Sequence, residues 1–237
     1  MGADLRELDN LVTDLLREDA ALIKPDEELR AIAMAVYRFS KDNPREVTDD
    51  ISADGGYSYT LPDLWVDGFS RIISVEYPAG EQDPAFLEEC DYGIYDDGST
   101  KKLRFWNFSA TSGYTIRLKF TTTWTVTTSA TTIEDKDAVA VANLAASICL
   151  RQLANHYAQT SKPSLDVDVI DYSRKSVEVT MLADVLENVY RDYMGIPRIG
   201  ARAKEGAAPI SAASLSKDLD IEFPWKENYI THPKRWR

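Results

Sequence analysis

The side chains best suited to metal binding or general base catalysis are few in this chain and stand far apart. Its two histidines are His156 and His232, and its two cysteines are Cys90 and Cys149. A zinc site needs several such ligands at short spacings, and a disulfide scaffold is dense in cysteine. We therefore expect no metal, no cofactor, two buried thiols and a reducing compartment. His156 falls inside a predicted helix, where a packing or surface role is more common than a catalytic one.

Carboxylates are abundant, with 39 Asp and Glu residues. Closely spaced acids occur at three places: Asp49 and Asp50, Glu88 and Glu89, and Asp166 and Asp168. Two carboxylates can act as the acid and base of a glycosidase, but 39 acids produce such pairs by chance. The last pair, together with Asp171, lacks the glycine and glutamate of a calcium-binding loop. The motifs GxxxxGK[ST], GxGxxG and GxSxG are absent from the sequence, so we predict that the chain is not an enzyme.

The charge of the chain is unevenly distributed. Its formal net charge of −12 is the sum of −15 for residues 1–197 and +3 for residues 198–237. An acidic body repels phosphate backbones, so sequence-specific DNA binding is not expected. The uncharged helical run at residues 138–150 is shorter than the roughly 20 residues that cross a bilayer. Residues 1–19 carry too many charges for a secretory signal, and we expect no membrane partner.

Four segments have the hydrophobic period of a helix: residues 4–18, 25–43, 134–159 and 171–194. The apolar stripe expected on the second segment consists of Leu29, Ile32, Ala33, Val36 and Tyr37. The last segment places an apolar stripe at Leu182, Val185, Leu186, Val189 and Tyr193. The third is alanine-rich and apolar on several sides, which is typical of the central helix of a bundle.

Between the helical pairs the hydrophobic period changes to two. The clearest alternation is Ile116, Leu118, Phe120, Thr122, Trp124 and Val126. Glycine-containing turns separate this strand from four other runs rich in aromatic and β-branched residues. We predict an α+β fold: a four-helix bundle core with an inserted antiparallel β-module and an extended C-terminal tail. Its segments are residues 1–44 and 130–196 for the helical pairs, 45–129 for the β-module and 197–237 for the tail.

Three aromatic residues of the β-module could stack on a sugar: Tyr92, Tyr95 and Trp106. In a module of this size such rings are more often part of the core, and we expect them there.

The last forty residues have the composition of a linker followed by a short strand. The predicted partner-binding residues of this tail are Leu219, Ile221, Phe223, Trp225, Tyr229, Ile230, Lys234, Arg235, Trp236 and Arg237. The first four alternate with acidic residues, as in a strand that pairs with the edge of another chain's sheet. Folding back onto the chain's own β-module is the alternative. Large aromatic side chains dominate interface energetics, so Trp225, Tyr229 and Trp236 are the expected anchors.

One set of segments, in order along the chain, resembles a known family. It comprises two helices, a β-insertion opened by Leu61-Pro62 with Trp65 and Gly68, the segment Ile72-Ile73-Ser74-Val75-Glu76-Tyr77-Pro78, and Asp137-Ala138 leading into the helix that ends in His156-Tyr157-Ala158. Residues 169–178, followed by Leu182-Ala183 and residues 190–193, are similar to the family's entry into its last helix. Ile170 replaces a valine there, and the arginine stands one place late. Over residues 4–195 the chain resembles the head-tail adaptor, or head completion, proteins of tailed phages.

The resemblance implies a structural virion protein without catalytic residues. Its copies would form a homo-oligomeric ring, expected to be a dodecamer, beneath the portal protein, and the C-terminal extension would grip the portal. A tail-side neck or tail terminator protein would bind the other side, and genomic DNA would pass through without specific binding. The expected location is the neck between capsid and tail, after assembly in the host cytoplasm. The alternatives are another neck, tail or baseplate component, a glycan-binding β-module, or a carboxylate-dependent hydrolase.

Overall fold

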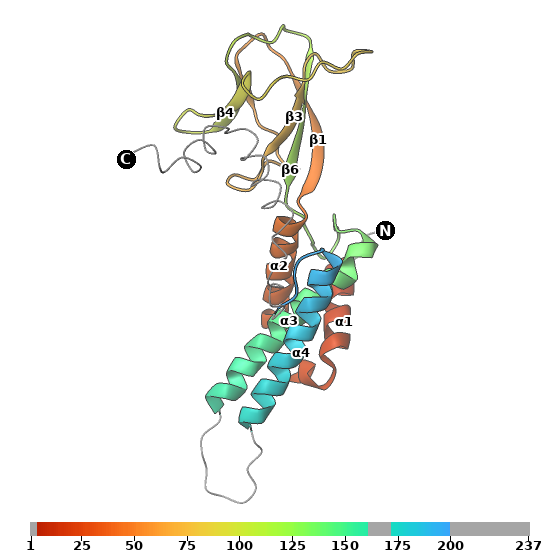
Figure 1. The fold of residues 1–237 in the computed structure, drawn as a ribbon. Helices are drawn as coiled ribbons and strands as arrows, with labels where there is room; N and C mark the ends of the chain where they lie inside the picture. The colour runs from red at the N-terminus through yellow and green to blue at the C-terminus, as the bar shows by residue number, and fades with distance from the viewer. Residues whose placement is uncertain (1–3, 161–171, 200–237) are drawn as a thin grey trace, which may run out of the picture. The chain divides into compact units, whose positions relative to one another are not determined.

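The computed structural model describes residues 4–160 and 172–199 of the chain, which form an α+β fold (Figure 1). The described residues contain four α-helices, one 3-10 helix and six strands in two antiparallel sheets. In chain order these are α1 (Leu5–Leu16), η1 (Arg17–Leu22), α2 (Pro25–Asp42), β1 (Arg45–Ser52), β2 (Ser58–Thr60), β3 (Ile72–Glu76), β4 (Tyr92–Asp96), β5 (Lys101–Phe105), β6 (Thr115–Thr122), α3 (Asp135–Thr160) and α4 (Tyr172–Tyr193). All four predicted helical segments are present.

The helix α1 begins at a side-chain cap and ends at an unusual backbone conformation. The carboxylate of Asp4 accepts a hydrogen bond from the backbone N–H of Glu7 at 2.9 Å, which satisfies one of the free donors of the first turn. Leu8, Val12 and Leu16 form its buried stripe. At Arg17 the backbone φ is +51°, a left-handed value that stops the helix and turns the chain into η1.

The helix α2 buries part of the predicted stripe, since Ile32 and Val36 are buried as expected. Pro25 occupies the first turn, where its missing N–H costs nothing. The buried apolar residues are Ala31, Ile32, Ala35, Val36 and Phe39. Leu29, Ala33 and Tyr37, which were expected inside, are exposed. The hydrophobic period did not identify the buried side fully, because α2 carries apolar residues on two of its sides.

The helix α3 is the central element of the helical core, as the sequence predicts. It contacts each of α1, α2 and α4. Its buried side includes six alanines, namely Ala138, Ala140, Ala142, Ala145, Ala146 and Ala154. Small side chains let neighbouring helices approach closely. By length and composition α3 could cross a membrane, but most of its apolar window is buried inside the chain.

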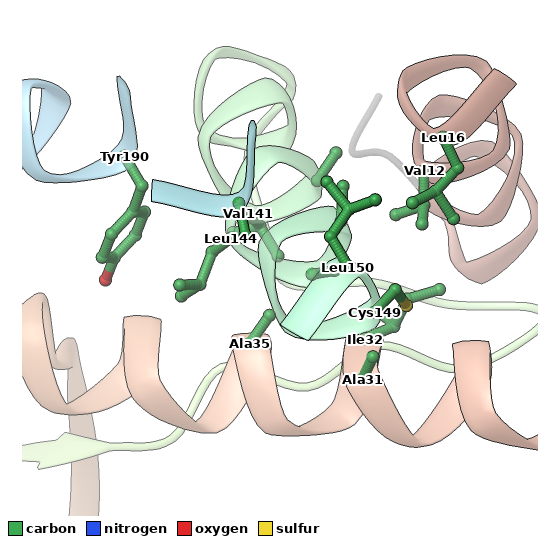
Figure 2. Close-up of a cluster of buried hydrophobic side chains, with 14 of the residues drawn as sticks. Val12, Leu16, Ala31, Ile32, Ala35, Val141, Leu144, Cys149, Leu150 and Tyr190 are labelled. Atoms are coloured by element: carbon green, nitrogen blue, oxygen red, sulfur yellow. The ribbon is translucent and has the colours of Figure 1, made fainter. Parts of the chain in front are cut away.

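Buried residues from all four helices meet in one hydrophobic cluster. Figure 2 shows part of it: Val12 and Leu16 of α1 and Ile32 and Ala35 of α2 lie around α3, and Tyr190 comes from α4. Cys149 is fully buried in this cluster, as expected, whereas Cys90 is exposed and the prediction for it is wrong.

The six strands form two small antiparallel sheets. Their strand orders are β1-β6-β3 and β2-β5-β4. Along β6 the buried residues alternate with partly exposed ones, so the predicted period of two is confirmed there. A second hydrophobic cluster includes Leu118 and Phe120 of β6, Leu103 and Phe105 of β5, and Val75 of β3. The strand β6 ends at Thr122, earlier than predicted.

Trp124 leaves the sheet after β6 and packs against the helical cluster instead. Its ring centroid lies 5.7 Å from that of Phe39 in α2. The backbone N–H of Trp124 donates to Oγ of the fully buried Ser40 at 3.0 Å, and its indole N–H donates to the carbonyl oxygen of Asn43 at 2.6 Å. The end of α2 is therefore fixed directly to the segment that follows the last strand.

Candidate assembly surface

The helix α4 carries two apolar faces, and only one of them is buried by this chain. The buried face contains Val179, Ala183 and Tyr190. The outward face consists of Val177, Met181, Leu182, Val185, Val189 and Tyr193, and we call it the α4 outward face. Four of the five residues predicted for the buried stripe, Leu182, Val185, Val189 and Tyr193, lie on this outward face, so that prediction is wrong for them. Leu186 alone packs partly against the core.

The α4 outward face is continuous along the helix. Five of its residues follow one another at intervals of four, so each lies beside the next on a row that winds gradually round the helix. Met181 is 63% exposed and Val185 is 57% exposed. Isolated exposed apolar residues are normal on a protein surface, but contiguous rows of them mark sites where another surface binds. This face is the candidate site of the described residues.

A network of charges holds α4 in position from its buried side. Glu187 is 5% exposed and pairs with arginines from three helices. Its carboxylate lies 2.6 Å from Nη2 of Arg151 in α3, 2.8 Å from Nη2 of Arg191 in α4, and 3.1 Å from Nη2 of Arg38 in α2. A buried carboxylate with several charge-assisted hydrogen bonds fixes the relative position of the elements that supply the donors.

These contacts also set the protonation of Glu187. Burial alone would raise its pKa, but the hydrogen bond from Arg191 and the charges of Arg151, Arg38 and Arg191 outweigh burial and lower it. The carboxylate is therefore ionised at neutral pH, and the network is intact there.

Two tyrosines of α4 add hydrogen bonds to the neighbouring helices. The hydroxyl of Tyr190 donates to Oδ2 of Asp42 in α2 at 2.6 Å. Burial is the main reason that the pKa of Tyr190 is raised, so the hydroxyl keeps its proton. The hydroxyl of Tyr193 donates to Asp137 near the start of α3. The contacts of Glu187 and Tyr190 fix the side of α4 that faces α2 and α3, and Tyr193, at the edge of the α4 outward face, reaches α3 through its hydroxyl.

The aromatic residues of the β-module divide between core and surface. Tyr92 is buried as expected, but Tyr95 and Trp106 are 38% and 47% exposed, so the prediction is wrong for those two. The guanidinium carbon of Arg104 lies 4.6 Å from the centre of the Tyr95 ring and 5.6 Å from that of Trp106. The ring of Trp106 also lies against Gly93, where a Cβ atom would come within 3.1 Å. Arg104 therefore lies over both rings, and each ring remains partly exposed.

Other candidates from the sequence that the structure describes lie apart or have partners of their own. His156 lies on the exposed surface of α3. Asp50 is bound by Arg117 at 2.8 Å, and that hydrogen bond lowers the pKa of the carboxyl. Within residues 4–160 and 172–199, no three His, Cys, Asp or Glu side chains are arranged to hold a metal ion.

Several predicted residues lie outside the described part of the chain. These are Asp166, Asp168 and Asp171, His232, and all ten predicted partner-binding residues: Leu219, Ile221, Phe223, Trp225, Tyr229, Ile230, Lys234, Arg235, Trp236 and Arg237.

Sequence reasoning missed both the α4 outward face and the Glu187 network. The face has a signal in the sequence, because Val177, Met181, Val185, Val189 and Tyr193 recur every four residues beside a second apolar row. Of the network, only the i, i+4 pair of Glu187 and Arg191 has a sequence signal, because Arg38 and Arg151 are distant along the chain.

No protein-family model and no curated protein matches this chain. Three solved structures are similar to it at low identity. A chain from the neck of an empty gene transfer agent particle, with C6 symmetry, is 16% identical and covers 83% of this chain and 91% of its own length. A chain from the neck of the native particle, with C12 symmetry, is 14% identical and covers 82% and 93%, and one from the native virion is 16% identical and covers 82% and 91%. All three have a TM-score of 0.27, which does not establish a common fold.

Proposed function

We propose that the chain is a structural component of a virion neck, a head-to-tail adaptor. Its copies form a homo-oligomeric ring beneath the portal that joins the capsid to the tail and forms part of the DNA channel. The helical segments, residues 1–44 and 130–196, make up the four-helix bundle of each subunit. Residues 45–129 form the inserted β-module, and residues 197–237 form the tail that binds the portal.

The observation that carries this proposal is the α4 outward face. A chain whose last described helix is apolar on two sides buries one side itself and needs another protein to cover the second. Self-assembly supplies that second surface in a ring protein. The resemblance of residues 4–195 to head-tail adaptors supports the same conclusion from the sequence.

The charge of the body fits a channel protein. A net charge of −15 over residues 1–197 disfavours tight contact with the phosphate backbone, so DNA passes without specific binding. Other neck, tail or baseplate proteins also assemble into multi-subunit structures, but they bind a partner other than the portal. A binding experiment with the portal therefore separates the adaptor role from these alternatives.

The test is co-assembly of the full chain with the portal protein of the same virus, followed by sedimentation and electron microscopy. We expect ring density beneath the portal. The triple substitution Trp225→Ala, Tyr229→Ala and Trp236→Ala should weaken portal binding by a factor of about 10,000, because aromatic anchors each contribute about 2 kcal/mol.

The matched control is Tyr57→Ala, which removes an aromatic side chain that is 55% exposed on the β-module. Portal binding should be unchanged in this variant. Failure of the unmodified chain to bind the portal would refute the adaptor role. Equal binding by the triple variant would refute the role of the tail in portal binding. It would not test ring formation, which the cysteine experiment below addresses.

A further inference from the structure

A second helix of this chain also has an uncovered apolar side. Leu29, Ala33, Met34 and Tyr37 of α2 are all exposed, and we call them the α2 outward face. Leu29, Ala33 and Tyr37 follow at intervals of four, as the residues of the α4 outward face do. Leu29 and Tyr37 therefore span the same number of helical turns as Met181 and Val189 of α4, about 12 Å at 1.5 Å per residue.

One copy of the chain cannot bring these two faces together. The inner sides of α2 and α4 are joined to each other by the ion pair between Arg38 and Glu187 and by the hydrogen bond from Tyr190 to Asp42. Both helices also pack along α3. Their outward faces consequently point away from these contacts, and each must be covered by a different molecule.

The charges within the two faces are complementary. Arg30 and Lys41 lie on the outward side of α2, at either end of its apolar row. Glu178 and Asp192 lie on the outward side of α4, again at either end of the apolar row. Asp26 adds a negative charge to the α2 side, and Arg174 adds a positive charge to the α4 side. Arg174 pairs with Glu178 at 3.2 Å. The partly exposed Glu27 on α2 and Lys175 on α4 balance these charges overall, so the complementarity lies in the cations beside the α2 apolar row and the carboxylates beside the α4 apolar row.

Pairing of two identical faces is disfavoured by the same charges. In an antiparallel α4–α4 contact, Glu178 of each copy would lie near Asp192 of the other. In an antiparallel α2–α2 contact, Arg30 would lie near Lys41. Like charges across an interface cost free energy, whereas α2 against α4 places opposite charges together. The small side chain of Ala33, between Leu29 and Tyr37, also leaves space for a side chain such as Val185.

We propose that the α4 outward face of one copy packs against the α2 outward face of a second copy. This inference rests on the proposed homo-oligomer and names the two surfaces that build it. The contact is heterologous, because different faces of the same chain meet. Repetition of such a contact generates a ring when the rotation closes.

Cysteine pairing tests the contact directly. Two variant chains are made, and both carry Cys90→Ser to remove the exposed thiol. The first also carries Ala33→Cys, and the second also carries Val185→Cys. The two chains are mixed and oxidised, both free and assembled on the portal. We expect disulfide-linked dimers between positions 33 and 185 on the order of tenfold above a control, because docking raises the effective concentration of the thiols. The control mixes the Val185→Cys chain with one carrying Thr48→Cys, an exposed position of β1.

A pair of charge variants provides a second readout. Val185→Asp disables the α4 outward face, and Ala33→Asp disables the α2 outward face. Each variant alone should fail to form rings, because a heterologous chain of contacts is interrupted at every copy. Mixed together, they should form a capped 1:1 dimer, since each retains the face that the other lacks; mass measurement and circular dichroism report assembly and folding.

The outcomes separate this inference from the proposed function. Predominance of dimers linked between positions 185 and 185 would show a symmetric α4 contact and overturn the inference while leaving a ring possible. Linkage between 33 and 185 no greater than in the Thr48→Cys control would overturn it as well. Loss of portal binding by the unmodified chain, with 33–185 linkage retained, would refute the adaptor role alone.

Discussion

Glu187 illustrates how one carboxylate can organise three helices. Its two oxygen atoms are bound by Arg38, Arg151 and Arg191, and the residue is 5% exposed. Removing one member of a buried ionic network leaves the others without compensation, and this costs more than the intact network contributes.

We predict that Glu187→Gln lowers the free energy of unfolding by about 3 kcal/mol at pH 7, measured by urea denaturation. The pKa of Glu187 is lowered in the folded chain, so its stabilising contribution is present above the ordinary glutamate pKa and is lost as the pH falls through the folded value. The difference between the two proteins should therefore shrink in acid. The control is Glu178→Gln, an exposed glutamate on the outward side of the same helix; a similar loss there would contradict the prediction.

Glu28 of α2 is a buried carboxylate with the opposite pH behaviour. It is 9% exposed and accepts one hydrogen bond, at 3.1 Å, from the hydroxyl of Thr13 in α1. Burial raises its pKa, the hydrogen bond from Thr13 acts against burial, and the charge of Asp9 adds to the increase.

We predict that Glu28→Gln raises the free energy of unfolding by about 1 kcal/mol at pH 8. A group with a raised pKa stabilises the fold below its unfolded pKa and loses that contribution as the pH rises through the folded value. The gain in the variant should therefore diminish towards pH 4. Urea titrations across this range test it, with the exposed Asp26→Asn as a reference; a gain that is constant with pH would exclude the titration of Glu28 as its cause.

At the scale of elements, the junction between α2 and the segment after β6 depends on one hydroxyl group. Ser40 Oγ donates to the carbonyl oxygen of Val36 at 2.8 Å and accepts the backbone N–H of Trp124 at 3.0 Å. Without that hydroxyl, the N–H group of Trp124 has no acceptor at this position, and an unpaired buried donor is costly.

We predict that Ser40→Ala lowers the free energy of unfolding by about 2 kcal/mol and increases hydrogen exchange at the Trp124 amide. Ser147→Ala is the matched control, because Ser147 is also buried in a helix and donates to a backbone carbonyl, that of Leu144, at 2.7 Å. No backbone N–H donates to its hydroxyl among the described contacts. Equal destabilisation by the two substitutions would show that the contact to Trp124 contributes little.

The elements themselves could be predicted from the sequence, but not the partner of each face. Hydrophobic periods of 3.6 and 2 reflect the geometry of one helix or strand, so all four helices and the β-rich insertion were found. The same periods do not say which molecule covers an apolar row. Leu29 and Tyr37 on α2, and Val185 and Val189 on α4, therefore looked like core residues although they are exposed.

Contacts between segments far apart in the chain could not be predicted from the sequence either. Trp124 continues the alternation of β6, yet its side chain joins the helical cluster because α2 ends beside it. Arg38, Arg151 and Glu187 meet only once the helices have packed. The tail residues lie outside the described part of the chain, and their role stays a prediction.

At the scale of the whole molecule, the two thiols of the chain provide a natural probe of opening. Cys149 is fully buried between helices, and burial, with the charges of Glu28 and Glu27, raises the pKa of its thiol to about 12. Cys90 is exposed. A thiolate is the reactive species, so the buried group is unreactive until the helices separate.

We predict that Cys90 reacts rapidly with a disulfide reagent at pH 8. Cys149 should react more slowly than Cys90 by a factor on the order of a thousand or more. In a Cys90→Ser variant, the labelling rate should rise with added urea in parallel with the loss of helical circular dichroism. Rapid labelling of Cys149 in the absence of urea would show that α3 is accessible in the native chain.

The alanines of α3 have a consequence that extends past the single subunit. Their methyl groups set how closely α2 and α4 can approach α3, and so the angle between the two outward faces. In a closed ring of heterologous contacts, that angle is the curvature of the ring. In the ring proposed above, the copy number and the bore would then depend on buried alanines of α3 rather than on the outward faces alone.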